Sequence, residues 1–211
     1  GERKTVNIKN GEIAEIIARK IDEVSGITGV EAISSTQAML SFENSSNTIV
    51  KDFVSFNLHG IDGKMIAIDA EVNFGSGVNN MNLGPLSTEI NKHSGQTGIT
   101  AYLTDDSQAI LLKTQRGFDI IIEDFNLKAD INSVNMYINE MKSNGEISPI
   151  SLKLSQTSSG ADANDSARIF GEVVLKSHKH FIVNSSENNS VLALREKELS
   201  FRSLSSIAAR S

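Results

Sequence analysis

The chain has 211 residues, a formal net charge of −6 and neither cysteine nor tryptophan. This length can bury one large or two small cores. The lack of cysteine excludes disulfides, thiolate metal sites and a cysteine nucleophile. No basic face of the kind that binds nucleic acid stands out, and no apolar run approaches the roughly 18 residues of a membrane-spanning helix. We therefore expect contact with neither nucleic acid nor membrane.

A short motif that occurs twice gives the chain its organisation. It reads Ser-Gly-Ile-Thr-Gly-Val-Glu-Ala at Ser25–Ala32 and Ser-Gly-Gln-Thr-Gly-Ile-Thr-Ala at Ser94–Ala101, 69 residues later. Each copy follows an amphipathic segment and precedes an extended one. The first glycine of each copy suits a left-handed helix C-cap, and the second suits a turn position with positive φ. Two copies in the same context predict a duplicated helix–turn–strand unit.

The first unit begins with an alternating segment, Lys4–Lys9, which predicts a short strand. Glu12–Val24 carries apolar residues at helical spacing and predicts an amphipathic helix. After the first motif, Val30–Ile33 and Ala38–Phe42 have the character of extended chain. The polar run Glu43–Asn47 predicts a loop and marks the first candidate domain boundary.

The second unit opens with a predicted hairpin. Its strands are Ile49–Leu58 and Lys64–Asn73, and the turn between them holds two glycines. After a loop, Gly84-Pro85 opens a helix, because proline is tolerated in the first helical turn. The strands predicted after the second motif are Ile99–Leu103, Ala109–Thr114 and Phe118–Phe125.

The last third of the chain is more polar. Ile131, Val134, Ile138 and Met141 fall at helical spacing and predict a third helix that stops at Asn144-Gly145. The remaining predicted elements are a strand at Ile150–Leu154, a loop at Ser155–Ser166, a final hairpin from Ile169–Lys176 and His180–Val183, and a polar tail at Val191–Arg210.

Together these elements predict an α+β fold of antiparallel β-sheets, each packed by a short helix. The duplicated units predict two small domains. We expect residues 1–46 and 167–211 to form one discontinuous domain and residues 47–166 to form the other.

Candidate reactive residues are few. His178 and His180 would share one face of a predicted strand, which suggests a metal pair, but no third ligand lies nearby in sequence. Asp105-Asp106-Ser107 is more typical of a hairpin turn than of paired catalytic carboxylates. Asp162 and Asp165 lack the spacing of a calcium loop.

Sequence motifs for nucleotide binding or hydrolysis are also absent: there is no P-loop, Gly-x-Ser-x-Gly or Gly-x-Gly-x-x-Gly. We therefore expect no catalytic, cofactor-binding or metal-binding residue, and a protein that is not an enzyme. Four Asn-x-Ser sequons mark exposed loops where glycosylation is an option, at Asn44, Asn164, Asn184 and Asn188.

The two units resemble the internal repeat of bacterial flagellins. That repeat runs strand, helix with a central Ile-Asn, Ser-x-x-Thr-Gly-Val/Ile-x-Ala, and a hairpin ending in Gly-x-Asp-Ile. The second unit carries Ile90-Asn91, the motif and Gly117–Ile120, whereas the first carries Ile21-Asp22 and the motif but no Gly-x-Asp-Ile. Further segments similar to flagellin are Val54–Gly60, Gly171–Val183 and Ser203–Ile207, which leaves Asn126–Arg168 as a variable region.

The resemblance implies an exposed, extracellular region of a flagellar filament subunit that supports motility. The family's terminal helices, which build the filament core and contact other flagellin subunits, lie outside this sequence. Because the chain begins at Gly1 rather than at methionine, we interpret it as a piece of a longer protein. We expect the isolated piece to be monomeric and to need no cofactor, with the first unit nearer the filament core.

Three alternatives remain open at this point. A hook–filament junction (hook-associated) protein would carry a similar repeat. A module that binds host or surface glycans is suggested by the polar loops Gly75–Asn82 and Ser155–Ser166. A metal-dependent hydrolase would use His178 and His180.

Overall fold

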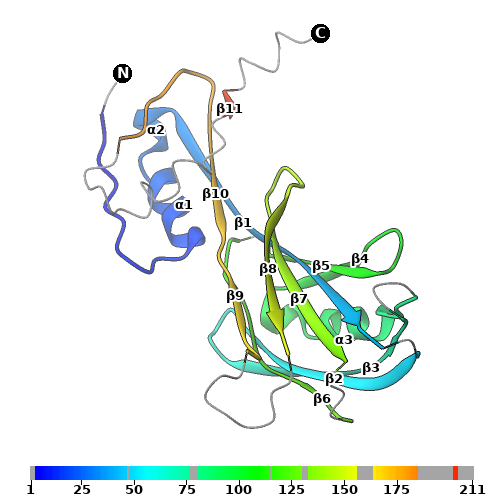
Figure 1. Ribbon diagram of the computed structural model, residues 1–211. Coiled ribbons are helices and arrows are strands. Elements are labelled where there is room, and N and C mark those ends of the chain that lie inside the picture. Colours follow the sequence, from blue (N-terminus) through cyan, green and yellow to red (C-terminus); the bar gives the residue numbers. More distant parts are fainter. Residues whose placement is uncertain are drawn as a thin grey trace, which may run out of the picture.

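The chain folds into a small lobe and a larger β-sandwich (Figure 1). The structure is a computed structural model that describes residues 3–46, 48–76, 80–114, 116–129, 133–155, 164–184 and 202–203. Its two sheets are antiparallel except where β10 pairs with β11, and its helices are short. The fold is therefore α+β, as the sequence predicts.

The helices are α1 (Ala14–Asp22), α2 (Ser25–Thr28), α3 (Gly84–Lys92) and α4 (Ser94–Thr97). The strands are β1 (Val30–Asn44), β2 (Val50–His59), β3 (Met65–Phe74), β4 (Thr100–Leu103), β5 (Ala109–Thr114), β6 (Ile120–Leu127), β7 (Val134–Met141), β8 (Ile147–Leu154), β9 (Ala167–Ile169), β10 (Glu172–Ser177) and β11 (Arg202–Ser203).

Strand β1 connects the two lobes. Its first half, residues 30–35, pairs with β10 in the small lobe. Its second half pairs with β5 through residues 36–41 and with β7 through residues 37–44, inside the sandwich. Strands β4 and β8 complete this larger sheet, and the facing sheet has the order β3-β2-β6-β9. One continuous strand therefore passes through both lobes (Figure 1).

The core of the sandwich is apolar and closely packed. Side chains from alternate positions of both sheets point inward, which gives β5, β7 and the second half of β1 their alternating burial. Three of its phenylalanines form a cluster, with ring centroids 5.3 Å apart for Phe42–Phe74 and 6.4 Å apart for Phe42–Phe125. Helix α3 packs on β3 and β4 and buries Leu86 and Ile90 completely. The helix therefore closes one side of the sandwich.

The small lobe has a much thinner core. Helix α1 packs on β1 and β10. Its buried cluster consists of Ala18, Val30, Ala32 and Leu175, with Ile21, Val173, Phe181 and Val183 packed against it while partly exposed. The sandwich core, by contrast, includes Ala38 in the second half of β1 and both Ala167 and Ile169 of β9. Whether the lobes fold as separate domains with the expected boundaries stays a prediction.

The predicted third helix is wrong. Residues 134–141 form strand β7, which pairs with β1 and β8. Val134, Met136 and Ile138 alternate along it, and all three are buried in the sandwich core. Asn144-Gly145 forms the turn of the β7–β8 hairpin instead of a helix end, with the Gly145 N–H donating to the Lys142 carbonyl at 2.9 Å. The residue expected to begin this helix, Ile131, lies outside the described residues.

Two predicted strands are also wrong. Lys4–Lys9 runs beside α1 without joining a sheet, and the Lys20 ammonium holds it there by donating to the Asn7 carbonyl at 2.8 Å. His180–Val183 is irregular chain whose Phe181 and Val183 pack against the small cluster. The two extended segments expected after the first motif are a single strand, β1. The expected helix at 12–24, the β2–β3 hairpin and the helix opening at Gly84 are confirmed.

Candidate functional site

The two copies of the motif have the same backbone conformation. Ser25–Thr28 and Ser94–Thr97 each form one helical turn, and the glycine that follows is left-handed, with φ of 68° at Gly29 and 69° at Gly98. Positive φ at the second glycine is thus confirmed, and only glycine adopts it without strain. The expectation of a left-handed cap at the first glycine is wrong, because Gly26 and Gly95 lie inside the helical turn.

The motif threonine links the end of the helix to the start of the strand in both copies. The Thr28 hydroxyl donates to the Val24 carbonyl at 3.0 Å and accepts from the Val30 N–H at 3.2 Å. The Thr97 hydroxyl makes the matching pair of hydrogen bonds, to His93 and Ile99, both at 3.1 Å. A single hydroxyl therefore satisfies a carbonyl at a helix end and an N–H at a strand start.

A polar residue near the end of the helix also has the same role in both units, as the hydrogen-bond acceptor of a strand N–H ten residues later. Asp22 Oδ1 accepts from the Ala32 N–H at 2.7 Å, and Asn91 Oδ1 accepts from the Ala101 N–H at 2.8 Å. Asn91 also donates through Nδ2 to the Ala101 carbonyl at 2.8 Å. The amide side chain thus occupies both backbone groups of an edge-strand residue, as a neighbouring strand would. The duplication seen in the sequence extends to individual hydrogen bonds.

The surroundings of the two motifs differ. The tip of the β2–β3 hairpin covers the second motif, with the Ile61 N–H donating to the Gln96 carbonyl at 3.3 Å. A Cβ added at Gly98 would lie 2.7 Å from Ile61 Cγ2, whereas one added at Gly29 would meet nothing within 4 Å. At the first motif, Ile27 occupies the position of Gln96 and is 49% exposed. The second motif therefore has a close neighbour at its second glycine that the first motif lacks, although Gln96, like Ile27, is exposed.

The shared strand face that made a metal pair of His178 and His180 conceivable does not form. His178 follows the end of β10 and His180 lies in irregular chain, so they share no strand face. His59 Nε2 lies 2.8 Å from Glu123 Oε2, and His93 Nε2 lies 3.2 Å from Glu89 Oε1. Among the described residues, no three His, Asp or Glu side chains are grouped as metal ligands.

The candidate acidic residues have local structural roles. Asp106 accepts from the Thr104 hydroxyl at 2.6 Å and from the Gln108 N–H at 3.0 Å, and these hydrogen bonds lower the pKa of its carboxyl. They close the predicted turn between β4 and β5. Asp165 accepts from the neighbouring Ser166 hydroxyl. Asp162 lies outside the described residues.

The sequons differ in accessibility. Asn44 is fully buried and donates to the Thr48 carbonyl at 2.9 Å, so a folded chain does not present it to a glycosylating enzyme. Asn164 is exposed and donates to the Lys153 carbonyl. Asn184 is exposed, and Asn188 lies outside the described residues. The expectation that sequons mark exposed loops is therefore wrong for Asn44.

The phenol of Tyr137, on the outer face of the larger sheet, has a shifted pKa. The Tyr137 hydroxyl donates to Glu43 Oε2 at 2.6 Å across the β1–β7 pair. This hydrogen bond, followed by burial and the negative charge of Glu43, raises the pKa of Tyr137 above its ordinary value of 10.0. The neutral phenol therefore adds stability that is fully present below pH 10.0 and is lost as the pH rises through the folded-state pKa.

We predict that Glu43→Gln moves the ionisation of Tyr137 to lower pH. The chain has two tyrosines and no tryptophan, so in a Tyr102→Phe background the ultraviolet absorbance of phenolate reports Tyr137 alone. Glu31→Gln, which removes an exposed carboxylate in the small lobe, should leave the titration unchanged. An identical titration in both variants would show that Glu43 does not set this pKa.

A carboxylate with an enclosed side chain lies where the lobes meet. Only 4% of the Asp119 side chain is exposed, and its Oδ2 accepts from Arg168 Nε at 2.8 Å. Its Oδ1 accepts from the Gly171 N–H at 3.3 Å. The Gly-x-Asp-Ile match at Gly117–Ile120 singled out Asp119 in the sequence. Nothing there indicated Arg168 or Gly171, because both lie about fifty residues further along the chain.

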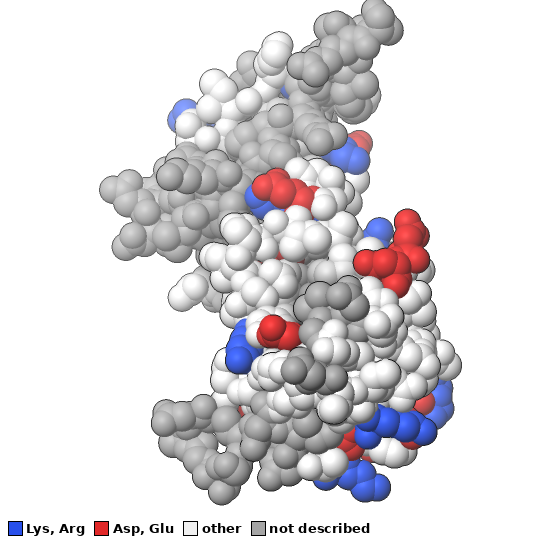
Figure 2. Space-filling model, turned by 45° about the vertical axis from the view of Figure 1, so that its right-hand side comes forward, with Lys and Arg blue, Asp and Glu red and all other residues white. Residues whose placement is uncertain are grey.

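Charges on the displayed face of the molecule are interspersed, with basic and acidic side chains in small separate groups (Figure 2). None of the helices in the described part of the chain is long and apolar enough to cross a membrane. No family model and no curated protein matches this sequence. Function must therefore be proposed from the repeats and their geometry.

Proposed function

We propose that this chain is the outer, solvent-exposed part of a bacterial flagellin, a structural subunit of the extracellular flagellar filament. The observation that carries the proposal is the duplicated unit. Its two copies share the motif, the left-handed glycines Gly29 and Gly98, and the hydrogen bonds of Asp22 and Asn91 to a strand N–H 10 residues later. A flagellin-type repeat would preserve these features for their structural roles.

The path of the chain supports a projecting role. Residues 3–13 and 178–184, near the two ends of the described chain, both lie in the small lobe (Figure 1). The sandwich is built from the residues between them and lies at the other end of the molecule. If filament-core segments are attached to both ends of this chain, the small lobe would therefore lie close to the filament core and the sandwich would lie further from it.

The side chains that could support chemistry fit a structural role better than a catalytic one. His59 and His93 pair with carboxylates of their own lobe, and Asp106 is used to close a turn. In this proposal the partners are other flagellin subunits, contacted through terminal helices outside this sequence. The piece alone is then monomeric in light scattering, without any added metal.

Antibody labelling of intact cells tests the proposal. Antibodies raised against the purified chain should decorate the filaments of the source bacterium along their whole length in electron micrographs. A strain lacking the gene that encodes this chain is the control and should show no label. Label confined to the junction of hook and filament would identify a hook-associated protein instead. Label on the cell body, with bare filaments, would favour the adhesin alternative and overturn the proposal.

A further inference from the structure

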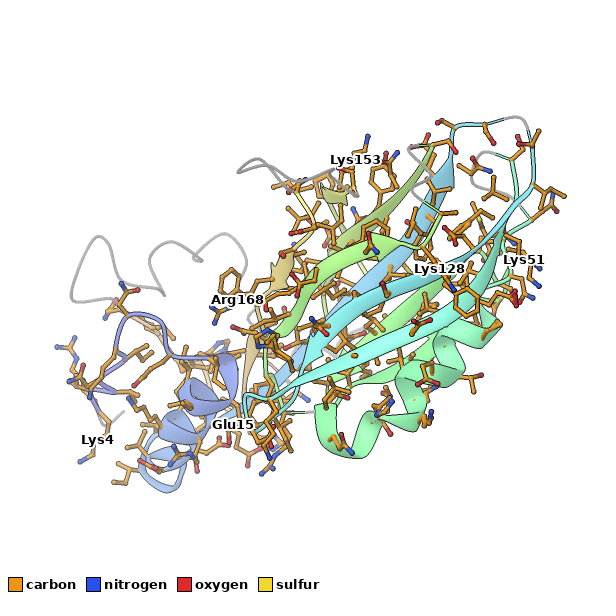
Figure 3. The ribbon with its side chains drawn as sticks, turned by 90° about the horizontal axis from the view of Figure 1, so that it is seen from below. Lys4, Glu15, Lys51, Lys128, Lys153 and Arg168 are labelled. Atoms are coloured by element: carbon orange, nitrogen blue, oxygen red, sulfur yellow. The ribbon has the colours of Figure 1, made fainter. Side chains whose placement is uncertain are left out.

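We propose that Gly117, Asp119, Arg168 and Gly171 form a joint that fixes the orientation of the small lobe relative to the sandwich. These four residues lie where the chain leaves β9 for β10 and where the β5–β6 connection reaches the small lobe. Figure 3 shows Arg168 between the small lobe and the sandwich. The four residues together are called the joint.

Asp119 fixes the point at which the chain leaves the sandwich. Ile120 pairs with Ile169, so Asp119 lies beside the end of β9. Its carboxylate holds the Arg168 guanidinium on one oxygen and the Gly171 N–H on the other. Because the side chain is only 4% exposed, these charge-assisted hydrogen bonds are shielded from water and restrict both partners. The start of β10 is therefore held to the edge of the sandwich.

The absence of side chains at Gly117 and Gly171 allows helix α1 to pack closely against the joint. A Cβ added at Gly171 would lie 2.7 Å from Ala14 Cβ and 2.6 Å from the Gly117 carbonyl oxygen. A Cβ added at Gly117 would lie 2.6 Å from Ser34 Cβ. Distances this short are far inside van der Waals contact, so any larger residue would displace α1 or β1. The first turn of α1 thus rests directly on backbone from the sandwich side.

Further hydrogen bonds hold the lobes on either side of the joint. The Ser34 hydroxyl, in the half of β1 that pairs with β10, donates to the Arg116 carbonyl of the β5–β6 connection at 3.1 Å. The Ser143 N–H, in the turn of the β7–β8 hairpin, donates to Glu172 Oε2 of β10 at 2.8 Å. Strand β1 is also continuous through both lobes. Because the lobes are in contact at several separate points, one lobe cannot rotate about any single contact without breaking the others. The lobes are therefore expected to move as one body.

The joint also gives a physical role to the Gly-x-Asp-Ile segment of the second unit. Gly117 permits the close approach of β1 and α1, Asp119 holds the chain exit, and Ile120 is fully buried in the sandwich core. If the proposed function holds, the joint would set the angle at which the sandwich projects from a filament. The joint itself does not depend on that function.

Spin-label distance measurements test the joint directly. The chain has no cysteine, so Arg19→Cys on α1 and Lys64→Cys on the sandwich provide two unique labelling sites. Both side chains are largely exposed, at 60% and 81%. The otherwise unchanged chain should give one narrow distribution of inter-label distances. Asp119→Ala and Gly171→Ala should each broaden that distribution at least twofold or shift its centre.

Two further variants keep the test decisive. Arg168→Gln removes the ion pair at a half-exposed position, and should broaden the distribution even if Asp119→Ala folds poorly. Glu71→Gln is the matched control. It breaks a solvent-exposed ion pair with Lys51 that lies between two strands of the sandwich, and it should leave the distance distribution unchanged. Circular dichroism confirms that each variant is folded. Unchanged distributions in all folded joint variants would overturn the proposal, whatever the antibody labelling shows.

Discussion

Replacement of Phe74 by alanine is expected to lower the free energy of unfolding by about 3–5 kcal/mol. Phe74 ends strand β3, is fully buried, and packs against Phe42 with ring centroids 5.3 Å apart. The substitution removes most of a large apolar side chain from a closely packed core and leaves a cavity that its neighbours fill only in part. Loss of the tilted ring pair adds to this cost.

Urea unfolding followed by far-ultraviolet circular dichroism measures this effect, because the chain has no tryptophan to report by fluorescence. Phe53→Ala is the matched control. Phe53 is 39% exposed on the outer face of β2, where Lys128 lies over its ring. Its removal should cost about 1 kcal/mol or less. Equal losses for the two variants would mean that the cluster of three phenylalanines does not hold the sandwich together.

The duplicated unit could be predicted from the sequence because its signals are local. Ser25–Gly29 and Ser94–Gly98 each concentrate a helix stop, a left-handed glycine and a strand start in a few residues. The β2–β3 hairpin likewise followed from alternation around a glycine-containing turn. In both cases the residues that decide the conformation are neighbours along the chain, so no knowledge of distant partners was needed.

Elements decided by distant partners could not be predicted in the same way. In residues 134–141, Val134, Ile138 and Met141 fit a helix, but Val134, Met136 and Ile138 equally fit a strand. Pairing with β1 and β8 decides between them. The polar run at residues 34–37 concealed the continuity of β1. Nothing in the local sequence shows that Thr36 is buried, or that its hydroxyl finds a partner in the distant Phe118 carbonyl.

The joint illustrates the same limit for a candidate site. Asp119 and Arg168 are 49 residues apart, and only the β6–β9 pairing brings them together. The requirement for glycine at residue 171 could not be predicted for the same reason. A side chain there would collide with Ala14, near the other end of the chain. Local patterns therefore recover the repeated units, whereas the contacts that assemble them depend on topology.

Asn91→Ala tests the repeated unit itself and is expected to cost about 2 kcal/mol. The substitution removes the acceptor for the Ala101 N–H and one donor to the Ala101 carbonyl. That carbonyl keeps the Ser87 hydroxyl at 3.2 Å, but the N–H of a residue only 4% exposed loses its partner. An unpaired buried N–H carries most of the expected loss.

Comparison with the first unit separates the contributions of the two hydrogen bonds that Asn91 makes to Ala101. Asp22 accepts from the N–H of Ala32, which is also buried, but has no amide donor. Asp22→Ala should therefore cost slightly less than Asn91→Ala, about 1.5 kcal/mol. Asn91→Asp keeps the acceptor and loses the donor, and should fall between the alanine variant and the unchanged chain. Asn57→Ala, which removes an exposed hydrogen bond to Asp124, is the control and should cost no more than about 0.5 kcal/mol. If Asn91→Ala destabilises the chain no more than Asn57→Ala, the side chain does not substitute for a neighbouring strand. In that case the shared Ile-Asn and Ile-Asp positions would reflect sequence similarity without a common structural task.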